Sequence, residues 1–126
     1  MKQDEKNKIL EAAKYGTLPP DFERWDISDN DGWTVAHSAA HHGHLPDRFD
    51  RWDLADNTGL TVAHVVARRG HLPANFDSWD MANVRGWTVG HEAARYGQLP
   101  DDFRLWSLTD DNGVTVRNVA DEEERK

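Results

Sequence analysis

Hydrophobic and polar positions follow a pattern that returns every 27 residues along this chain. The period is marked by four glycines, at Gly32, Gly59, Gly86 and Gly113. It defines three full units, 32–58, 59–85 and 86–112. Residues 5–31 keep the second half of the unit, and 113–126 keep only its beginning. A fixed period of this length is typical of repeat proteins. We therefore predict one repeat domain over 1–126, with 5–31 as its N-terminal capping unit and 113–126 as its C-terminal half-repeat cap.

The first half of each unit predicts a short helix. In the first full unit, small apolar residues form one stripe at helical spacing: Val35, Ala36, Ala39 and Ala40. Thr34 precedes the stripe and can cap the helix through its hydroxyl. Gly43 follows it, where a left-handed residue commonly ends a helix.

The second half of each unit predicts a second helix of about two turns. Leu45, Phe49 and Trp52 are spaced as one face of a helix, and Pro46 suits its first turn. Phenylalanine and tryptophan return at these positions in four units, at Phe22, Trp25, Phe49, Trp52, Phe76, Trp79, Phe103 and Trp106. We expect these rings in the core, because a two-turn helix is unstable alone and must pack against its neighbours. The predicted fold is an all-α solenoid.

The start of the unit resembles the ankyrin repeat, whose signature includes T-P-L-H-x-A. The sequence Gly-x-Thr-Val-Ala-His stands at 32–37 and 59–64, and Gly-His follows at 43–44 and 70–71. Val-Ala replaces the usual Pro-Leu pair, and the unit is shorter than the usual ~33 residues. The resemblance implies stacked helix-turn-helix units joined by short turns. It also implies that His37, His64 and His91 hydrogen-bond the backbone of neighbouring turns and tie one repeat to the next.

Charge and composition narrow the function. The chain has 15 Lys and Arg against 23 Asp and Glu, so its net charge is −8, and it has no Cys. This balance disfavours nucleic acid and anionic membranes as partners. The charged N-terminus lacks the apolar segment of a signal peptide, and no apolar run is long enough for a membrane span. We expect a cytoplasmic monomer, and the polar terminal units suggest a complete array.

Candidate chemistry is sparse. There is no Cys nucleophile, phosphate-binding loop or dinucleotide fingerprint, and most carboxylates recur at turn positions. Of the seven His, only His41 and His42 are not repeated in other units. No third metal ligand is evident beside them. We expect no enzyme activity, no metal and no cofactor.

Positions that differ between matched units are not required for the fold and are available to bind a partner. At the turn tips and helix ends they are rich in Trp, Tyr and Arg, which are common at protein interfaces. The ankyrin resemblance implies that these positions form a concave binding face. The predicted contact set is Trp33, Leu60, Arg68, Arg69, Arg85, Trp87, Arg95 and Tyr96. Their charge favours a protein partner with an acidic surface, and the predicted role is that of an adaptor or inhibitor.

Two alternatives stay open. The first is an acidic immunity-type or anti-defence inhibitor that blocks a nucleic-acid-binding enzyme. It would use aspartates on or beside the predicted second helices, at Asp47, Asp50, Asp53, Asp77, Asp80, Asp101 and Asp102. The simpler interpretation of these charges is solubility. The second alternative is a structural array without a specific partner.

Overall fold

The chain is all-α, with one helix in each repeat. The computed structural model describes residues 2–124. In this range it has five helices: α1 (Gln3–Tyr15), α2 (Val35–His41), α3 (Val62–Arg69), α4 (Val89–Arg95) and α5 (Val116–Glu124). The only strand-like pairing in the same range is four isolated antiparallel bridges. None of the described helices is both long and apolar enough to cross a membrane.

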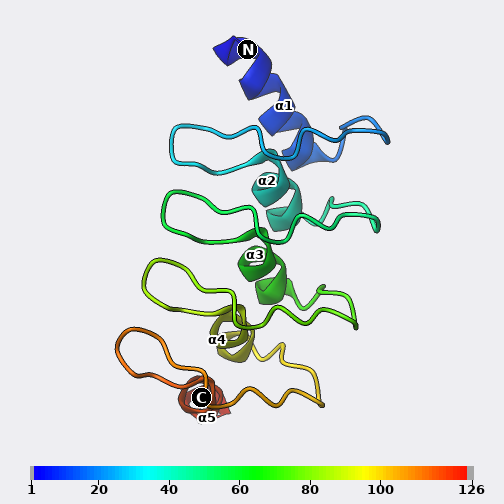
Figure 1. Ribbon diagram of the computed structural model, residues 1–126. Helices are drawn as coiled ribbons and strands as arrows, with labels where there is room; N and C mark the ends of the chain where they lie inside the picture. The colour runs from blue at the N-terminus through cyan, green and yellow to red at the C-terminus, as the bar shows by residue number, and fades with distance from the viewer. Residues whose placement is uncertain (1, 125–126) are drawn as a thin grey trace. The chain divides into compact units, whose positions relative to one another are not determined.

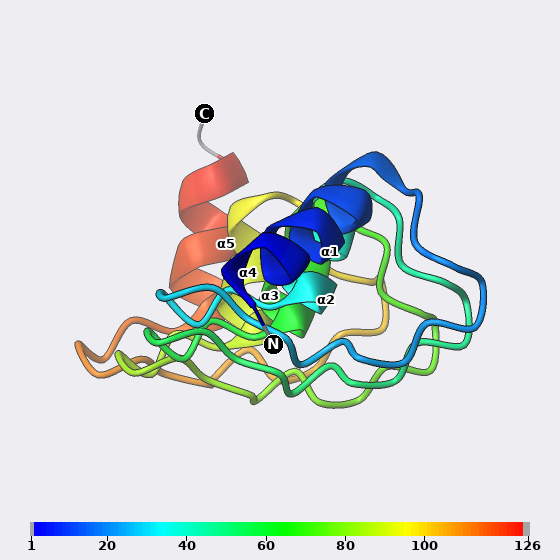
Figure 2. The same cartoon turned by 90° about the horizontal axis from the view of Figure 1, so that it is seen from above.

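The chain forms two compact units, Met1–Val62 and Ala63–Lys126. The first contains α1 and α2, and the second contains α4, α5 and nearly all of α3. Within each unit, hairpins project to one side of the helices and longer loops to the other (Figure 1). The view from above shows the same division (Figure 2). The single repeat domain stays a prediction.

The predicted apolar helix stripe is confirmed. Val35, Ala36, Ala39 and Ala40 are all buried on α2. The Thr34 hydroxyl accepts a hydrogen bond from the His37 amide at 3.1 Å, which caps the helix as predicted. Helix α4 begins in the same way at Thr88. The alanines leave room for close helix packing, and α4 packs against α5 in the second unit.

Each of the helices α2 to α5 is preceded by a hairpin, which spans 28–34, 55–61, 82–88 or 109–115. At the first tip, the Asp29 carboxylate accepts hydrogen bonds from the amides of Asp31 (2.9 Å) and Trp33 (3.0 Å). Asp56, Asn83 and Asp110 make the same pair of bonds in their own hairpins. A side chain that bonds the backbone two and four residues ahead fixes the turn locally. The hairpin conformation is therefore the same in every repeat.

The predicted second helix is wrong. Residues 44–54 form a long loop with two separate turns, closed by bonds from Phe49 N–H to the Pro46 carbonyl (3.0 Å) and from Leu54 N–H to the Arg51 carbonyl (3.2 Å). The equivalent loops are 17–27, 71–81 and 98–108. The carbonyls of these loops serve as acceptors for the following helix. In the loop 17–27, the carbonyls of Trp25 and Ile27 accept hydrogen bonds from the first free N–H groups of α2.

Aromatic rings hold the long loops together. In the first unit, Trp25 packs edge-to-face with Phe22 at 5.1 Å and with Phe49 at 5.4 Å. In the second unit, Trp79 packs in the same way with Phe76 at 5.1 Å and with Phe103 at 5.6 Å. Edge-to-face contact is a favoured arrangement of aromatic pairs. Of the eight rings predicted in the core, Trp25, Phe49 and Phe103 are buried, and the other five are only partly buried. All of them lie on turns instead of a helix.

Candidate protein-binding face

Buried histidines join each repeat to the hairpin of the next. His37 is fully buried, and its Nε2 lies 2.8 Å from the carbonyl oxygen of Leu60. His64 Nε2 lies 2.8 Å from the Trp87 carbonyl, and His91 Nε2 lies 2.8 Å from the Val114 carbonyl. One side chain therefore contributes both to a helix start and to the following hairpin.

The hydrogen bonds of His37 also define its protonation. Its Nδ1 accepts from the Thr34 amide at 3.2 Å and from the Thr34 hydroxyl at 2.7 Å. The proton must then be on Nε2, which donates to Leu60. Burial lowers the pKa of His37, more than the Leu60 carbonyl and the nearby carboxylates Asp56 and Asp29 raise it. The ring is neutral in the folded protein at pH 7.

The hairpins of successive repeats also bond to each other. The Asn57 amide donates to the Asp31 carbonyl at 3.0 Å, and the Asp111 amide donates to the Arg85 carbonyl at 2.9 Å. At Asp56, burial raises the pKa, but hydrogen bonds from Thr58 and Leu60 outweigh it and lower the pKa overall. The carboxylate that shapes this tip is therefore held in its charged form.

Contacts in the first unit place a hairpin residue and the outer side of a helix on one surface. The Trp33 indole N–H donates to the Ser38 hydroxyl at 2.8 Å, and the Trp33 ring lies 6.4 Å from the His41 ring. Trp33 also packs against buried His37 at 4.8 Å. Trp33 is half-buried, and so is Leu60 on the next hairpin. These two residues of the predicted set therefore have structural roles as well.

The other six residues of the predicted set lie in the second unit. Trp87 is half-buried and packs against His91 at 4.8 Å, as Trp33 does against His37. Arg69 and Arg95 are exposed at the ends of α3 and α4. Arg85 is exposed on the hairpin 82–88, and Tyr96 is exposed immediately after α4. Trp87 and Arg85 therefore lie on one hairpin, and Arg95 and Tyr96 lie together at the end of α4.

Arg68 forms an ion pair with a residue of the next repeat. Its Nε lies 3.4 Å from a carboxylate oxygen of Glu92, whose side chain is only 8% exposed. Glu92 was not among the predicted residues, although the sequence carries a signal: Ser38 and Val65 occupy the matching positions, so an acidic residue there is unusual. The Glu92 carboxylate therefore offsets the positive charge of Arg68. The exposed arginines of the predicted set are Arg69, Arg85 and Arg95.

The structure offers little for other chemistry. In the part of the chain that it describes, no group of three or more His, Asp or Glu side chains is arranged to hold a metal ion. His41 and His42 pack ring to ring at 4.8 Å. Neither a scan against protein-family models nor a search of curated proteins finds a match to this chain.

Proposed function

We propose that the repeats form an ankyrin-like solenoid that binds another protein through the hairpins and the outer sides of the helices. We call this surface the hairpin–helix face. Its proposed members are Trp33, Leu60, Arg69, Arg85, Trp87, Arg95 and Tyr96, with the Arg68–Glu92 pair beside them. The protein would act as an adaptor or inhibitor by presenting this face, without catalysing a reaction.

One observation carries the proposal: the residues that cap the helices and link the repeats are constant, whereas exposed positions on the hairpins and at the helix ends differ. The capping threonines and linking histidines, such as Thr34 and His37, are buried and recur in each full unit. The exposed hairpin-tip position, by contrast, is Asp31, Thr58 or Arg85. Different side chains at exposed positions of a constant backbone are what a binding role would produce. A rigid scaffold also loses little conformational entropy on binding.

The chemistry of the second unit suits a protein partner. Val84 is 67% exposed at the tip of its hairpin, and Tyr96 is 46% exposed after α4. Exposed arginines, Arg85 and Arg95, lie on the same two elements. Apolar and aromatic groups flanked by arginine are enriched at protein interfaces. The arginines would select an acidic surface on the partner.

The test is capture of partners from an extract of the source cells, followed by mass spectrometry. The variant Arg85→Glu/Arg95→Glu reverses two exposed charges and leaves the Arg68–Glu92 pair intact. The matched control, Asp50→Arg/Asp77→Arg, reverses two exposed charges on the long loops. We expect a partner that is captured by wild type and the control and lost with the first variant. A partner retained by the first variant would contradict the proposed face.

The aspartates of the long loops support a second candidate, an acidic inhibitor of a nucleic-acid-binding enzyme. All seven are exposed, and they lie on loops instead of helices: Asp47, Asp50, Asp53, Asp77, Asp80, Asp101 and Asp102. Exposed carboxylates on loops could approach a basic surface closely. In the same experiment, loss of a basic nucleic-acid enzyme with the Asp50→Arg/Asp77→Arg variant would favour this candidate.

A further inference from the structure

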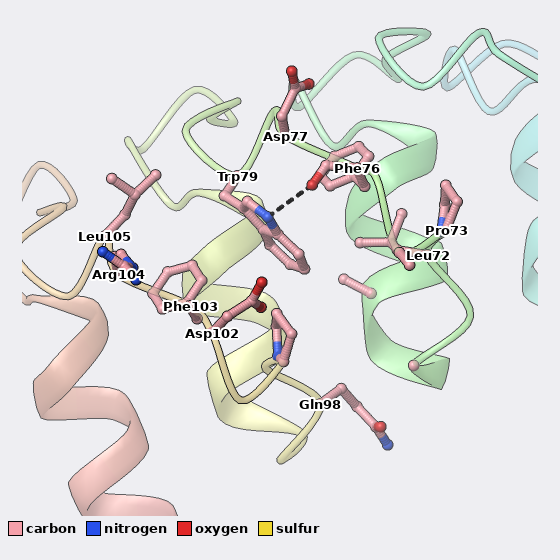
Figure 3. A pocket seen from close by; sticks show the side chains of 14 residues that line it. Leu72, Pro73, Phe76, Asp77, Trp79, Gln98, Asp102, Phe103, Arg104 and Leu105 are labelled. Carbon is pink, nitrogen blue, oxygen red and sulfur yellow. Dashed lines mark hydrogen bonds between the residues drawn. The ribbon is translucent and has the colours of Figure 1, made fainter.

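Each unit has a groove on its long-loop side, and the two grooves are built from equivalent positions. The groove of the second unit, about 420 Å³, lies between the loops that contain Leu72 and Pro100 (Figure 3). The groove of the first unit, about 240 Å³, lies between the loops that contain Leu18 and Pro46. Each residue that lines the first groove has its counterpart, two repeats later, in the lining of the second. The two can therefore be compared position by position.

The first groove is occupied by a side chain of the protein itself. The guanidinium of Arg48 donates a hydrogen bond from Nη2 to the Pro20 carbonyl and lies 3.4 Å from the Phe22 carbonyl. It thereby bridges the two loops that form the groove. Arginine suits this role because its planar head carries several donors in fixed directions.

The second groove has Asp102 at the position of Arg48. A carboxylate has no N–H to donate to the loop carbonyls, so Asp102 cannot bridge this groove as Arg48 bridges the first. Within residues 2–124, Asp102 takes part in no ion pair and no side-chain hydrogen bond. Figure 3 shows its carboxylate below the indole ring of Trp79, facing the groove. The larger volume of the second groove agrees with the missing bridge.

The walls of the second groove are largely apolar. Leu72, Pro73 and Trp79 line it, and Leu105 at its edge is 43% exposed. The Trp79 indole N–H donates to the Phe76 carbonyl at 3.1 Å, which fixes the orientation of the ring (Figure 3). The charged residues of the lining are Asp77, Asp102 and Arg104, so the groove has a net negative charge. A preformed, largely apolar site of this charge is suited to an apolar segment that carries a single cation.

We propose that the second groove binds an arginine of a protein partner, flanked by apolar residues, in the place that Arg48 occupies in the first groove. The guanidinium pairs with Asp102 and donates to the carbonyl of Ala74, which corresponds to that of Pro20. The flanking side chains pack on Leu72 and Trp79. Charge complementarity and the occupied first groove both identify this ligand chemistry. The proposal is independent of the hairpin–helix face.

The direct test is titration of the full-length, ¹⁵N-labelled protein with the blocked peptide acetyl-Ala-Leu-Arg-Leu-Ala-amide, followed by NMR. We expect saturable shifts of the Trp79 indole signal and of the amides in 98–105. The analogue with Gln in place of Arg should bind about tenfold more weakly or less, because it loses the charge-assisted contact. Equal binding of the two peptides, shifts confined to other regions, or no saturable shifts would each overturn the proposal.

Two charge exchanges provide the matched variants. Asp102→Arg should fill the second groove from within and weaken the Arg peptide about tenfold or more, while Asp102→Asn should weaken it by a smaller factor. Arg48→Asp should open the first groove and produce a second set of shifts around Trp25. Both positions are exposed, and far-UV circular dichroism checks that the three variants fold. Unchanged affinity in Asp102→Arg with an unchanged spectrum would contradict the proposal.

Discussion

The two sides of the repeats are built by different forces. On the hairpin side, Asp29, Asp56, Asn83 and Asp110 make the same backbone bonds at 2.8–3.1 Å in every repeat. On the long-loop side, the backbone bonds within each loop close single turns, and its shape depends on edge-to-face rings such as Trp79 and Phe103. Hydrogen bonds require a narrow range of distances and angles, whereas ring pairs pack over a wider range of distances, so neighbouring side chains can vary more.

This difference explains where the repeats can vary. A hairpin can change its exposed residues, as Arg85 and Thr58 show, because the turn is fixed by one Asp or Asn and one Gly. A long loop can change its groove, because a single side chain decides whether the groove is bridged, as Arg48 and Asp102 show. The hairpin side thus offers a constant frame for different side chains. The long-loop side offers grooves that differ in volume and in the charge of one lining residue.

The largest predicted effect is on the link between a helix and the following hairpin. His37→Ala leaves the Leu60 carbonyl and the Thr34 amide without their partners and creates a cavity. We expect a loss of about 3 kcal/mol in the free energy of unfolding. Urea titration followed by circular dichroism measures it. His44→Ala, at an exposed position, is the control and should change the value by less than about 0.5 kcal/mol. Similar losses in both variants would disprove the special role of the link.

The next effect tests the contact between hairpins. Gly86 has φ +76°, and a Cβ there would lie 2.8 Å from the Asp111 amide nitrogen. Gly113 has almost the same φ, +77°, and an added Cβ would have nothing within 4 Å. Gly113→Ala therefore introduces only backbone strain, about 1 kcal/mol, while Gly86→Ala adds a clash. We expect Gly86→Ala to destabilise the protein by about 1 kcal/mol more. Equal losses would mean that the hairpins do not need close approach.

The same contrast explains what could be predicted from sequence. The helix α2 was predictable because its signals are local: Thr34 at its start, alanines at helical spacing, and Gly43 after it. The spacing of Leu45, Phe49 and Trp52 wrongly predicted a helix. Rings that pack against each other from separate turns can have the same spacing in sequence as rings on one helix face. The carbonyls of Trp25 and Ile27, needed by α2, leave no sign in the sequence. Helices confined to one segment are therefore more predictable than loops shaped by neighbours.

For the candidate site, residue types were predictable and pairings were not. The exposure of Arg85, Arg95 and Tyr96 follows from their variation at helix and hairpin ends. The Arg68–Glu92 pair joins residues from different repeats, and only the fold brings them within 3.4 Å. The bridge from Arg48 to the Pro20 carbonyl is likewise invisible in sequence, because a backbone acceptor has no residue type.

A smaller effect tests the ring packing of the long loops. Phe103 is buried and contacts both Trp79 and Trp106 edge-to-face. Phe103→Leu keeps an apolar side chain but removes both aromatic contacts, so we expect a loss of about 1–1.5 kcal/mol in the free energy of unfolding. Leu105→Ala, an exposed neighbour, is the control for stability and should have little effect. A loss below about 0.5 kcal/mol in Phe103→Leu would show that the loops do not depend on these rings.

The smallest effect concerns pH and returns to the hairpin side. Because burial lowers the pKa of His37 in the folded protein, the unfolded chain binds a proton more readily below its own pKa of about 6.5. Stability from this group is complete above that pH and is lost as the pH falls toward the folded pKa, by at most about 0.7 kcal/mol between pH 7 and 6. His37→Gln has no titrating group there, and the other histidines are common to both proteins. Urea titrations at pH 7 and pH 6 should therefore show a larger loss of stability in wild type than in His37→Gln. An equal or smaller loss in wild type would mean that His37 can be protonated at Nδ1 in the folded protein without loss of stability. The two contacts from Thr34 to Nδ1 oppose this.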